Sequence, residues 1–269
     1  MGRRWGSAER SAKGRPNDAG DCGVRVTIAG LIGYAAVVYV LFSFTRLGWL
    51  DALFLAALIE LLPVFAFVQV DLARDLVVER IQVYLTSSAM ILLLGVSSLV
   101  LGSRLVGLEG MGLRIEPRQV DQAILWGAAT FALGTATLGF FLVLRKRCGW
   151  SENRLVRELM PVTRREKTWY VGLSFCAGFG EELAYRAYAI PALIVAGGSA
   201  WAALALTSAA FAVLHSYQGV LGVARTGVVG VIMGMVFLHT GSVWPAIVAH
   251  ILIDLAVGFV LADRLLAEA

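Results

Sequence analysis

The sequence predicts an all-α protein that crosses a membrane several times, a polytopic transmembrane bundle of about eight helices. The 269 residues are 58% hydrophobic and only 16% charged, whereas soluble domains carry about 25% charged residues. The mean hydropathy is +0.76. Apolar runs of about the 20 residues that a bilayer span needs follow one another with short gaps, which favours one bundle over separate domains.

Four segments are expected along the chain. Residues 1–25 form a polar cytoplasmic tail, 26–144 the N-terminal transmembrane helices, 145–167 a basic amphipathic linker, and 168–262 a transmembrane core. The first apolar run is expected to be retained, because no convincing signal-peptide cleavage site follows it. The predicted spans are Val26–Phe44, Leu47–Val70, Ile81–Gly102, Ala123–Leu144, Trp169–Val195, Ala200–Tyr217, Thr226–Leu238 and Val243–Leu261.

Basic residues predict the orientation of these spans. The tail carries six Lys and Arg residues and the segment after the fourth span carries eight, more than any other loop. Four spans separate the two sets, so both lie on one side, which the positive-inside rule makes the cytoplasmic side. With eight spans both termini are cytoplasmic. We therefore expect an integral, multi-pass protein of the plasma (inner) membrane.

The net charge of +4 is then a sign of topology and does not indicate a nucleic-acid partner. The three cysteines, Cys22, Cys148 and Cys176, show no paired spacing, so neither a disulfide framework nor a cysteine zinc site is expected. The basic segment Arg145–Lys167 has the pattern of an amphipathic helix lying against acidic headgroups. A solvated basic loop is an equally good interpretation of it.

The stretch from Gly178 to Arg186 contains two adjacent carboxylates and an arginine in an apolar run. Charges at membrane depth cost several kcal/mol unless they are paired or hydrated, so such a cluster is a functional site by default. Glu182 and Arg186 are four residues apart and can pair on one helix face. Glu181 points about 100° away from Glu182. The pattern predicts one neutralised, structural carboxylate and one free carboxylate.

Further polar residues gather in the last third of the chain. His215 ends an apolar helix, and His250 precedes Asp254 by four residues, so Asp254 can accept a hydrogen bond from one ring nitrogen. His239 ends a span, where a histidine needs no special role. Glu60, in the second span, is interpreted as structural or as a marker of helix tilt. A single histidine is more often a core residue than a catalyst, but the whole constellation indicates a site.

Three short motifs lie in order on consecutive apolar helices: Glu181-Glu182-x-x-x-Arg186, Phe211-x-x-x-His215 and His250-x-x-x-Asp254. They resemble the motifs of the CPBP family, which contains the type II CAAX prenyl endopeptidases and the bacterial immunity-type intramembrane proteases. The resemblance covers roughly residues 150–262. Asp254 stands where asparagine is more common, and an ionised carboxylate cannot donate a hydrogen bond.

The resemblance implies a glutamate-dependent intramembrane endopeptidase with residues 168–262 as its catalytic core. Glu181 would activate a water with help from His215, while His250 and Asp254 would stabilise the oxyanion or hold the water. The substrate would be a membrane-embedded or lipidated peptide or protein, cut near a hydrophobic or lipid-anchored C-terminal segment. A prenylated CAAX substrate is implied only in a host that prenylates proteins.

Glu182 and Arg186 would organise this site. Members of the family have been described both as metalloproteases and as metal-free glutamate hydrolases. Glu181, His215 and His250 could bind zinc, since two histidines and one carboxylate form a catalytic zinc set. The sequence leaves both mechanisms open, and zinc is the cofactor to test.

Two other function classes stay open. The same fold could serve as a non-catalytic membrane immunity or scaffold protein that binds a peptide or a partner helix. A proton-coupled transporter also uses buried acids and histidines, but here the acids cluster at one place and no half-helix repeat is visible. On the predicted spans, His215 and His250 lie toward opposite membrane faces. They meet only if the fifth or sixth helix is broken, tilted or re-entrant, or if the predicted ends are wrong.

Overall fold

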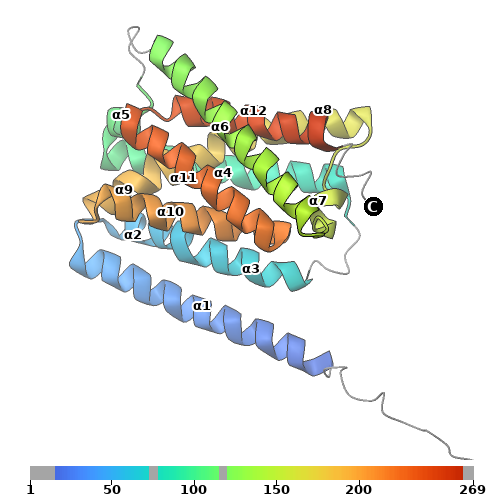
Figure 1. Ribbon diagram of the computed structural model, residues 1–269. Helices are drawn as coiled ribbons and strands as arrows, with labels where there is room; N and C mark the ends of the chain where they lie inside the picture. The colour runs from blue at the N-terminus through green and yellow to red at the C-terminus, as the bar shows by residue number, and fades with distance from the viewer. Residues whose placement is uncertain (1–15, 73–77, 115–119, 263–269) are drawn as a thin grey trace, which may run out of the picture.

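The computed structural model describes residues 16–72, 78–114 and 120–262, and these ranges contain helices and no strand (Figure 1). Eight long helical runs make up the described bundle. They are α1 (Pro16–Phe44); α2 (Trp49–Ala56), η1 (Ala57–Leu61) and α3 (Leu62–Leu72) in one run; α4 (Arg80–Leu105); α6 (Val120–Arg147); α8 (Arg164–Glu182), η3 (Leu183–Ala189) and α9 (Ile190–Val195) in one run; α10 (Ala200–Leu214); α11 (Gly219–Thr240); and α12 (Trp244–Ala256) with η5 (Val257–Leu261).

Three short helices join these runs: α5 (Gly107–Gly110), α7 (Arg154–Glu158) and the 3₁₀ turn η4 (Ser216–Gln218). Five helices are long and apolar enough to cross a membrane, and they are Gly23–Phe44, Trp49–Val70, Arg80–Leu105, Val120–Arg147 and Ser216–Thr240. Two more apolar helices, Ala200–Leu214 and Trp244–Val260, are shorter. The all-α polytopic bundle and the integral membrane location predicted from sequence are thereby confirmed.

Several helix ends differ from the prediction. α1 begins at Pro16, within the predicted tail, because a helix does not have to stop where its apolar stretch stops and proline is tolerated in a first turn. Residues 1–15 of that tail lie outside the described residues. The predicted seventh span, Thr226–Leu238, was too short, since α11 already begins at Gly219. The sixth span ends at Leu214, three residues earlier than predicted.

The basic linker is not one continuous surface helix. α6 runs on to Arg147, Gly149 turns with a positive φ of 66°, and only the five residues of α7 are helical before α8 begins. Val156 and Met160 are its buried apolar residues, so the linker packs onto the end of the bundle. Thr163 then starts α8 with a capping box, in which Thr163 and Glu166 each bond the other's backbone N–H.

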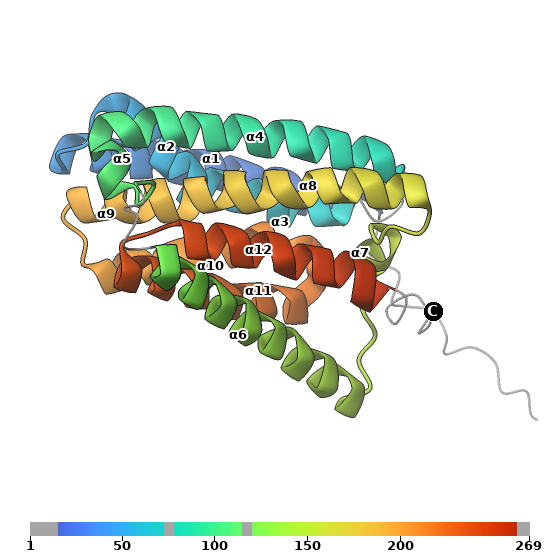
Figure 2. The ribbon, with the colours of Figure 1, turned by 90° about the horizontal axis from the view of Figure 1, so that it is seen from above.

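The run from α8 to α9 lies at the centre of the bundle. α8 packs between α4 and α12, and α12 and α11 pack against α6 (Figure 2). α10 lies between α11 and α3, while α1 covers the outer side of α2 and α3 (Figure 1). The candidate residues therefore come from helices that touch one another in the middle of the molecule.

Two glycines set how closely α8 approaches its neighbours. A Cβ on Gly180 would lie 2.4 Å from the carbonyl oxygen of Ile91 in α4. A Cβ on Gly178 would lie 2.4 Å from Cγ1 of Ile251 in α12. Small residues let helix backbones come this close. The Gly178-Phe-Gly180 motif is thus explained by packing on both sides, directly before the paired glutamates.

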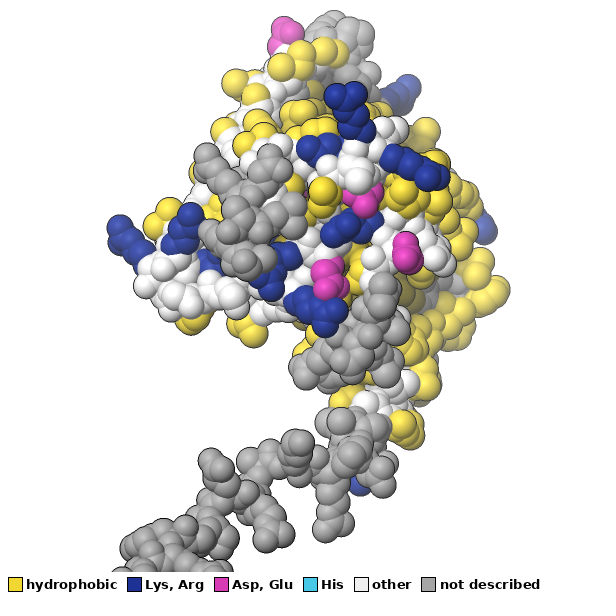
Figure 3. All heavy atoms as spheres, turned by 90° about the vertical axis from the view of Figure 1, so that its right-hand side faces the viewer, with side chains coloured by type: hydrophobic (Ala, Val, Ile, Leu, Met, Phe, Trp, Pro, Cys, Tyr) yellow, Lys and Arg dark blue, Asp and Glu magenta, His cyan; other side chains and the backbone are white. Residues whose placement is uncertain are grey.

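The linker and the start of α4 meet at one end of the bundle. Arg80 Nε donates to the carbonyl of Glu158 at 2.6 Å, and the Tyr84 hydroxyl donates to that of Leu159 at 2.7 Å. Lys and Arg side chains gather on this end, which faces the viewer in Figure 3. At the opposite end, Val243 N donates to the carbonyl of Gly112. The gathering of basic residues is consistent with the predicted cytoplasmic side, which stays a prediction.

Candidate active site

Glu182 is the buried centre of the constellation. Its side chain is fully buried, and its Oε1 atom accepts two hydrogen bonds. One comes from Nη1 of Arg186 at 2.8 Å and the other from Nδ1 of His250 at 2.8 Å. The pairing of Glu182 with Arg186 predicted from their spacing is thus present, and it is joined by a histidine from α12.

Arg186 ties this centre to two more helices. Its Nη2 donates to the carbonyl of Gly230 in α11 at 3.1 Å, and its guanidinium carbon lies 4.5 Å from the centre of the Phe211 ring in α10. A guanidinium over an aromatic face is held by the ring's negative quadrupole. Arg186 lies in the π-helical turn η3, a type of turn that is frequent at functional sites.

Glu181 faces the other way, into a cavity of about 780 Å³. Its Oε2 atom is buried and has no hydrogen-bond partner among the described residues. His215, His250 and Asp254 line the same cavity, whereas Glu182 does not. The predicted division into one neutralised and one free carboxylate is therefore what the structure shows.

The partner of His250 differs from the prediction. Its Nδ1 donates to Glu182, because a carboxylate only accepts. Its Nε2 lies 3.8 Å from Oδ2 of Asp254 and 3.9 Å from Oε2 of Glu181, too far for a hydrogen bond to either. The expected bond from His250 to Asp254 is absent, since a carboxylate on a neighbouring helix provides the better geometry.

His215 reaches the site because α10 is short. The helix has 15 residues and ends at Leu214, so His215 is its C-cap and is still partly buried. Nδ1 of His215 lies 2.8 Å from the carbonyl oxygen of Phe211, which can only accept. The proton is therefore on Nδ1, and Nε2 is the nitrogen that can accept a proton.

Phe211 brings the two histidines together. Its ring centre lies 4.8 Å from that of His215 and 6.2 Å from that of His250. The two histidines that the predicted spans placed toward opposite faces therefore contact the same aromatic ring. The predicted placement of His215 and His250 toward opposite membrane faces was therefore wrong.

Residues 165–256 match the family model described as type II CAAX prenyl endopeptidase Rce1-like. Through this segment the chain is similar to the type II CAAX prenyl endopeptidases of the CPBP family. The match spans 92 of the 269 residues, from the first turn of α8 to the end of α12. No match was found among curated proteins or among solved structures. The family is one of membrane-embedded proteases, which agrees with the predicted class of protein.

The Rce1-like segment contains every candidate site residue: Glu181, Glu182, Arg186, His215, His250 and Asp254. Two other polar residues that the sequence singled out lie elsewhere. His239 packs edge-on against Trp126, with ring centres 4.8 Å apart. Glu60 lies in η1 beside Gly33 of α1, and neither Glu60 nor His239 lines the cavity.

The Rce1-like segment also brings residues to the cavity that sequence reasoning missed. Tyr217, Gln218 and Arg225 line it from the turn after His215 and from the first turns of α11. Arg225 Nη2 donates to Oε1 of Gln218 at 2.7 Å. The available signal for this part of the cavity was Arg225, which directly precedes the predicted span Thr226–Leu238. It was overlooked because α11 was predicted to begin too late.

The donor set for a metal ion was tested on the geometry of the side chains. In the described part of the chain, no three His, Cys, Asp or Glu side chains form a group that could hold a metal ion. Nδ1 of His215 and Nδ1 of His250 are both engaged in hydrogen bonds, which leaves only Nε2 of each ring to bind a metal, and these side chains are not gathered into such a group. The zinc set Glu181, His215 and His250 does not fit a metal in this arrangement, so no step is routed through one.

Proposed function

We propose that the protein is an intramembrane endopeptidase in which Glu181 activates the attacking water. The observation that carries this proposal is the separation of two neighbouring carboxylates. Oε1 of Glu182 is engaged by Arg186 and His250, whereas Oε2 of Glu181 has no hydrogen-bond partner among the described residues and lies 3.9 Å from Nε2 of His250. A general base must be within reach of the proton that it takes, and only Glu181 of the pair lines the cavity.

The reaction follows from the tautomers of the two histidines. Glu181 takes a proton from a water that also donates to Nε2 of His215, and the water oxygen attacks the peptide carbonyl carbon. The carbonyl electron pair moves to oxygen, which accepts a hydrogen bond from a proton on Nε2 of His250. When the C–N bond breaks, the proton held by Glu181 passes to the leaving nitrogen.

His250 is suited to the oxyanion because of its surroundings. With Nδ1–H donated to Glu182, a second proton on Nε2 makes the ring a cation. The charges of Glu182 and Asp254, whose oxygens lie 2.8 and 3.8 Å from the ring nitrogens, balance that cation. Asp254 thus acts as a charge partner and not as a donor, in keeping with its carboxylate chemistry.

The cavity suits a hydrophobic substrate. Its volume lies in the range of ligand pockets, which is about 300–1,000 Å³. Most of its lining is apolar, from α4, α6, α8, α10 and α12, and its polar groups converge where Glu181, His215, His250 and Asp254 meet. We propose a membrane-embedded or lipidated peptide or protein, cut near its hydrophobic or lipid-anchored C-terminal segment.

The test uses the purified protein in nanodiscs with quenched peptides that end in hydrophobic residues. Glu181→Gln is expected to lower kcat by about 10²–10⁴-fold, the usual worth of a general base. Glu60→Gln is the matched control, since Glu60 is also an acid in a membrane helix but lies outside the cavity. It is expected to cleave as the wild type does.

Three other outcomes would change the assignment. Equal cleavage by the wild type and Glu181→Gln would remove Glu181 from the mechanism. Stoichiometric zinc in the active protein, with inhibition by chelators, would make it a metalloprotease. Tight peptide binding without cleavage by the wild type, retained in Glu181→Gln, would favour the non-catalytic scaffold.

A further inference from the structure

A second cavity, of about 570 Å³, lies at the basic end of the bundle. It is formed where the last turns of α6, the turn at residues 149–153, α7 and the start of α11 meet. Figure 2 shows the end of α6 diverging from α11 and α12 at this place. The lining residues with charged side chains are Arg145, Glu152, Arg154, Arg157 and Arg225.

The cavity carries an excess of positive charge. Glu152 Oε2 lies 3.0 Å from Nη1 of Arg145 and 3.9 Å from Nη1 of Arg225, so one carboxylate is shared by two guanidiniums. Arg154 forms an ion pair with Glu158 at 2.5 Å. Arg157 also lines the cavity, and the described residues provide it with no ion-pair partner. With Glu158 counted, four arginines face two carboxylates, and the remaining positive charge favours an anionic ligand.

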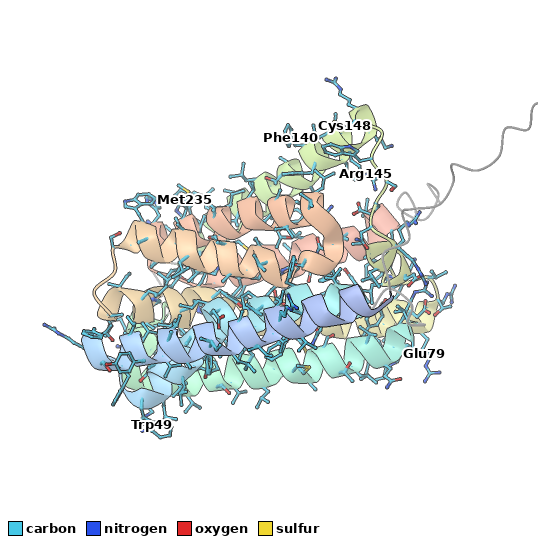
Figure 4. The ribbon with its side chains drawn as sticks, turned by 90° about the horizontal axis from the view of Figure 1, so that it is seen from below. Trp49, Glu79, Phe140, Arg145, Cys148 and Met235 are labelled. Carbon is cyan, nitrogen blue, oxygen red and sulfur yellow. The ribbon has the colours of Figure 1, made fainter. Side chains whose placement is uncertain are left out.

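Apolar side chains line this cavity and neighbour its lining along α6. Trp150 in the turn and Val220 on α11 line it and are exposed, Val220 to 88%. Phe140 and Val143, also exposed, are next to the lining residues Phe141 and Leu142 in the sequence of α6. Phe140 and Arg145 mark the last turns of α6 in Figure 4, next to the cavity-lining Phe141. Phe140 and Val143 on α6 and Val220 on α11 belong to candidate membrane spans, which suits them to contact acyl chains, whereas Trp150 lies in the turn just beyond α6. The ligand therefore needs both an anionic group and an apolar chain.

We propose that this second cavity binds the headgroup of an anionic phospholipid. Arginine guanidiniums bind phosphate oxygens through paired N–H donors. Basic pockets between membrane helices at the interface are suited to such headgroups, and each basic residue near the surface contributes about 1 kcal/mol. A free phosphate would use the same arginines but would gain nothing from the apolar side chains.

The site also touches the catalytic region. Gln218 and Arg225 line both cavities, and they follow His215 within ten residues. A Cβ on Gly219, which has a φ of 75°, would lie 3.3 Å from Nδ2 of Asn153 in the lipid site. A bound headgroup thus restrains the turn that positions His215. This coupling rests on the proposed function, whereas lipid binding does not.

Binding is tested on the purified full chain in phosphatidylcholine nanodiscs, with the thermal unfolding midpoint as readout. Titrated phosphatidylglycerol is expected to raise the midpoint saturably. Arg157→Gln is expected to weaken the apparent affinity about fivefold, the loss of one basic contact. Arg165→Gln is the matched control, since Arg165 is exposed on the same end but does not line the cavity. It is expected to keep the wild-type affinity.

A second pair of variants keeps the test valid if Arg157→Gln does not fold. Val220→Asp places a negative charge at this exposed part of the lining and is expected to weaken phosphatidylglycerol binding, while Val220→Asn is not. An equal shift from added phosphatidylcholine, or from inorganic phosphate alone, would overturn the lipid proposal. So would equal affinities for Arg157→Gln and Arg165→Gln, or for the two Val220 variants. Proteolysis need not be measured, so failure here is separate from failure of the proposed function.

Discussion

Oε1 of Glu182 and Nδ1 of His250 lie 2.8 Å apart although 68 residues separate them in the chain. The same oxygen accepts from Arg186, so one atom joins α8, η3 and α12. Glu182, the carboxylate that these hydrogen bonds hold, is therefore already neutralised by its partners. Its neighbour Glu181 is left facing the cavity.

Glu182→Gln is expected to destabilise the protein, in contrast to Glu181→Gln. Removing one partner of a buried ion pair leaves an uncompensated charge and costs about 3–5 kcal/mol. The comparison is made by thermal unfolding of both variants in one detergent. Equal midpoints for the two variants would contradict the structural role of Glu182.

Asp254→Asn is expected to leave the fold intact and to lower kcat/KM by less than about tenfold, or about 1.4 kcal/mol. Asp254 makes no hydrogen bond to His250, and its side chain is 30% exposed in the cavity. The measurement is kcat/KM on the quenched peptides used for Glu181→Gln. A loss comparable to that of Glu181→Gln would show that the second carboxylate takes part in proton transfer.

Gly180→Ala is expected to cost about 1–3 kcal/mol, since overpacking forces backbone shifts. The added Cβ would meet the backbone of Ile91 at 2.4 Å and move α8 away from α4. Gly172→Ala is the control on the same helix, where a Cβ meets nothing within 4 Å and alanine is the better helix former. The free energies of unfolding of both variants are measured from denaturation curves. If Gly172→Ala were destabilised as much as Gly180→Ala, the packing argument would be wrong.

The capping box of α8 gives an expected pH dependence. The backbone N–H of Thr163 bonds the carboxylate and is the main cause that lowers the pKa of Glu166, which lies before the apolar part of α8 begins. A lowered folded pKa stabilises the fold at pH above the ordinary value of 4.5, and this stabilisation is lost as the pH falls through the lower folded pKa.

Two variants check the cap. Thr163→Ala removes the side-chain half of the box and is expected to cost about 1 kcal/mol at neutral pH. Glu166→Gln is expected to flatten the loss of stability between about pH 5 and pH 3, an interval that begins above the ordinary glutamate pKa of 4.5 and extends below it. Unfolding midpoints measured across that interval test both statements. If the unfolding midpoint of Glu166→Gln falls with pH as steeply as that of the wild type, other carboxylates cause the loss of stability.

Local spacing predicted what lies along one helix. The bond between Glu182 and Arg186 follows from the four-residue repeat, and the opposite direction of Glu181 follows from the same geometry. The prediction for His250 and Asp254 used the same rule and was wrong, because the rule describes neighbours on one helix and not those across a helix contact. Glu182 became the partner of His250 only through the close approach of α8 and α12 at Gly178.

Helix ends limited the rest of the prediction. Hydropathy reports how long a segment is apolar, and not where its hydrogen bonding stops, so α1 and α11 were predicted too short and α10 too long. The predicted spans placed His215 and His250 apart, and the error at the start of α11 concealed Arg225. The order of the motifs survived these errors, since it does not depend on where a helix ends.

The glycine contacts at the centre of the bundle have a consequence for membranes of different thickness. At Gly95 the backbones of α4 and α8 meet directly, since a Cβ there would lie 2.8 Å from Cα of Gly180. A direct backbone contact has few rotamers to rearrange, which favours a constant spacing of α4 and α8 when the bilayer is stretched or thinned. The outermost helix, α1, packs mainly on α2, η1 and α3, and it can tilt to absorb hydrophobic mismatch (Figure 1). The helix contacts around the candidate site are thereby separated from the part of the bundle that adjusts to its lipid surroundings.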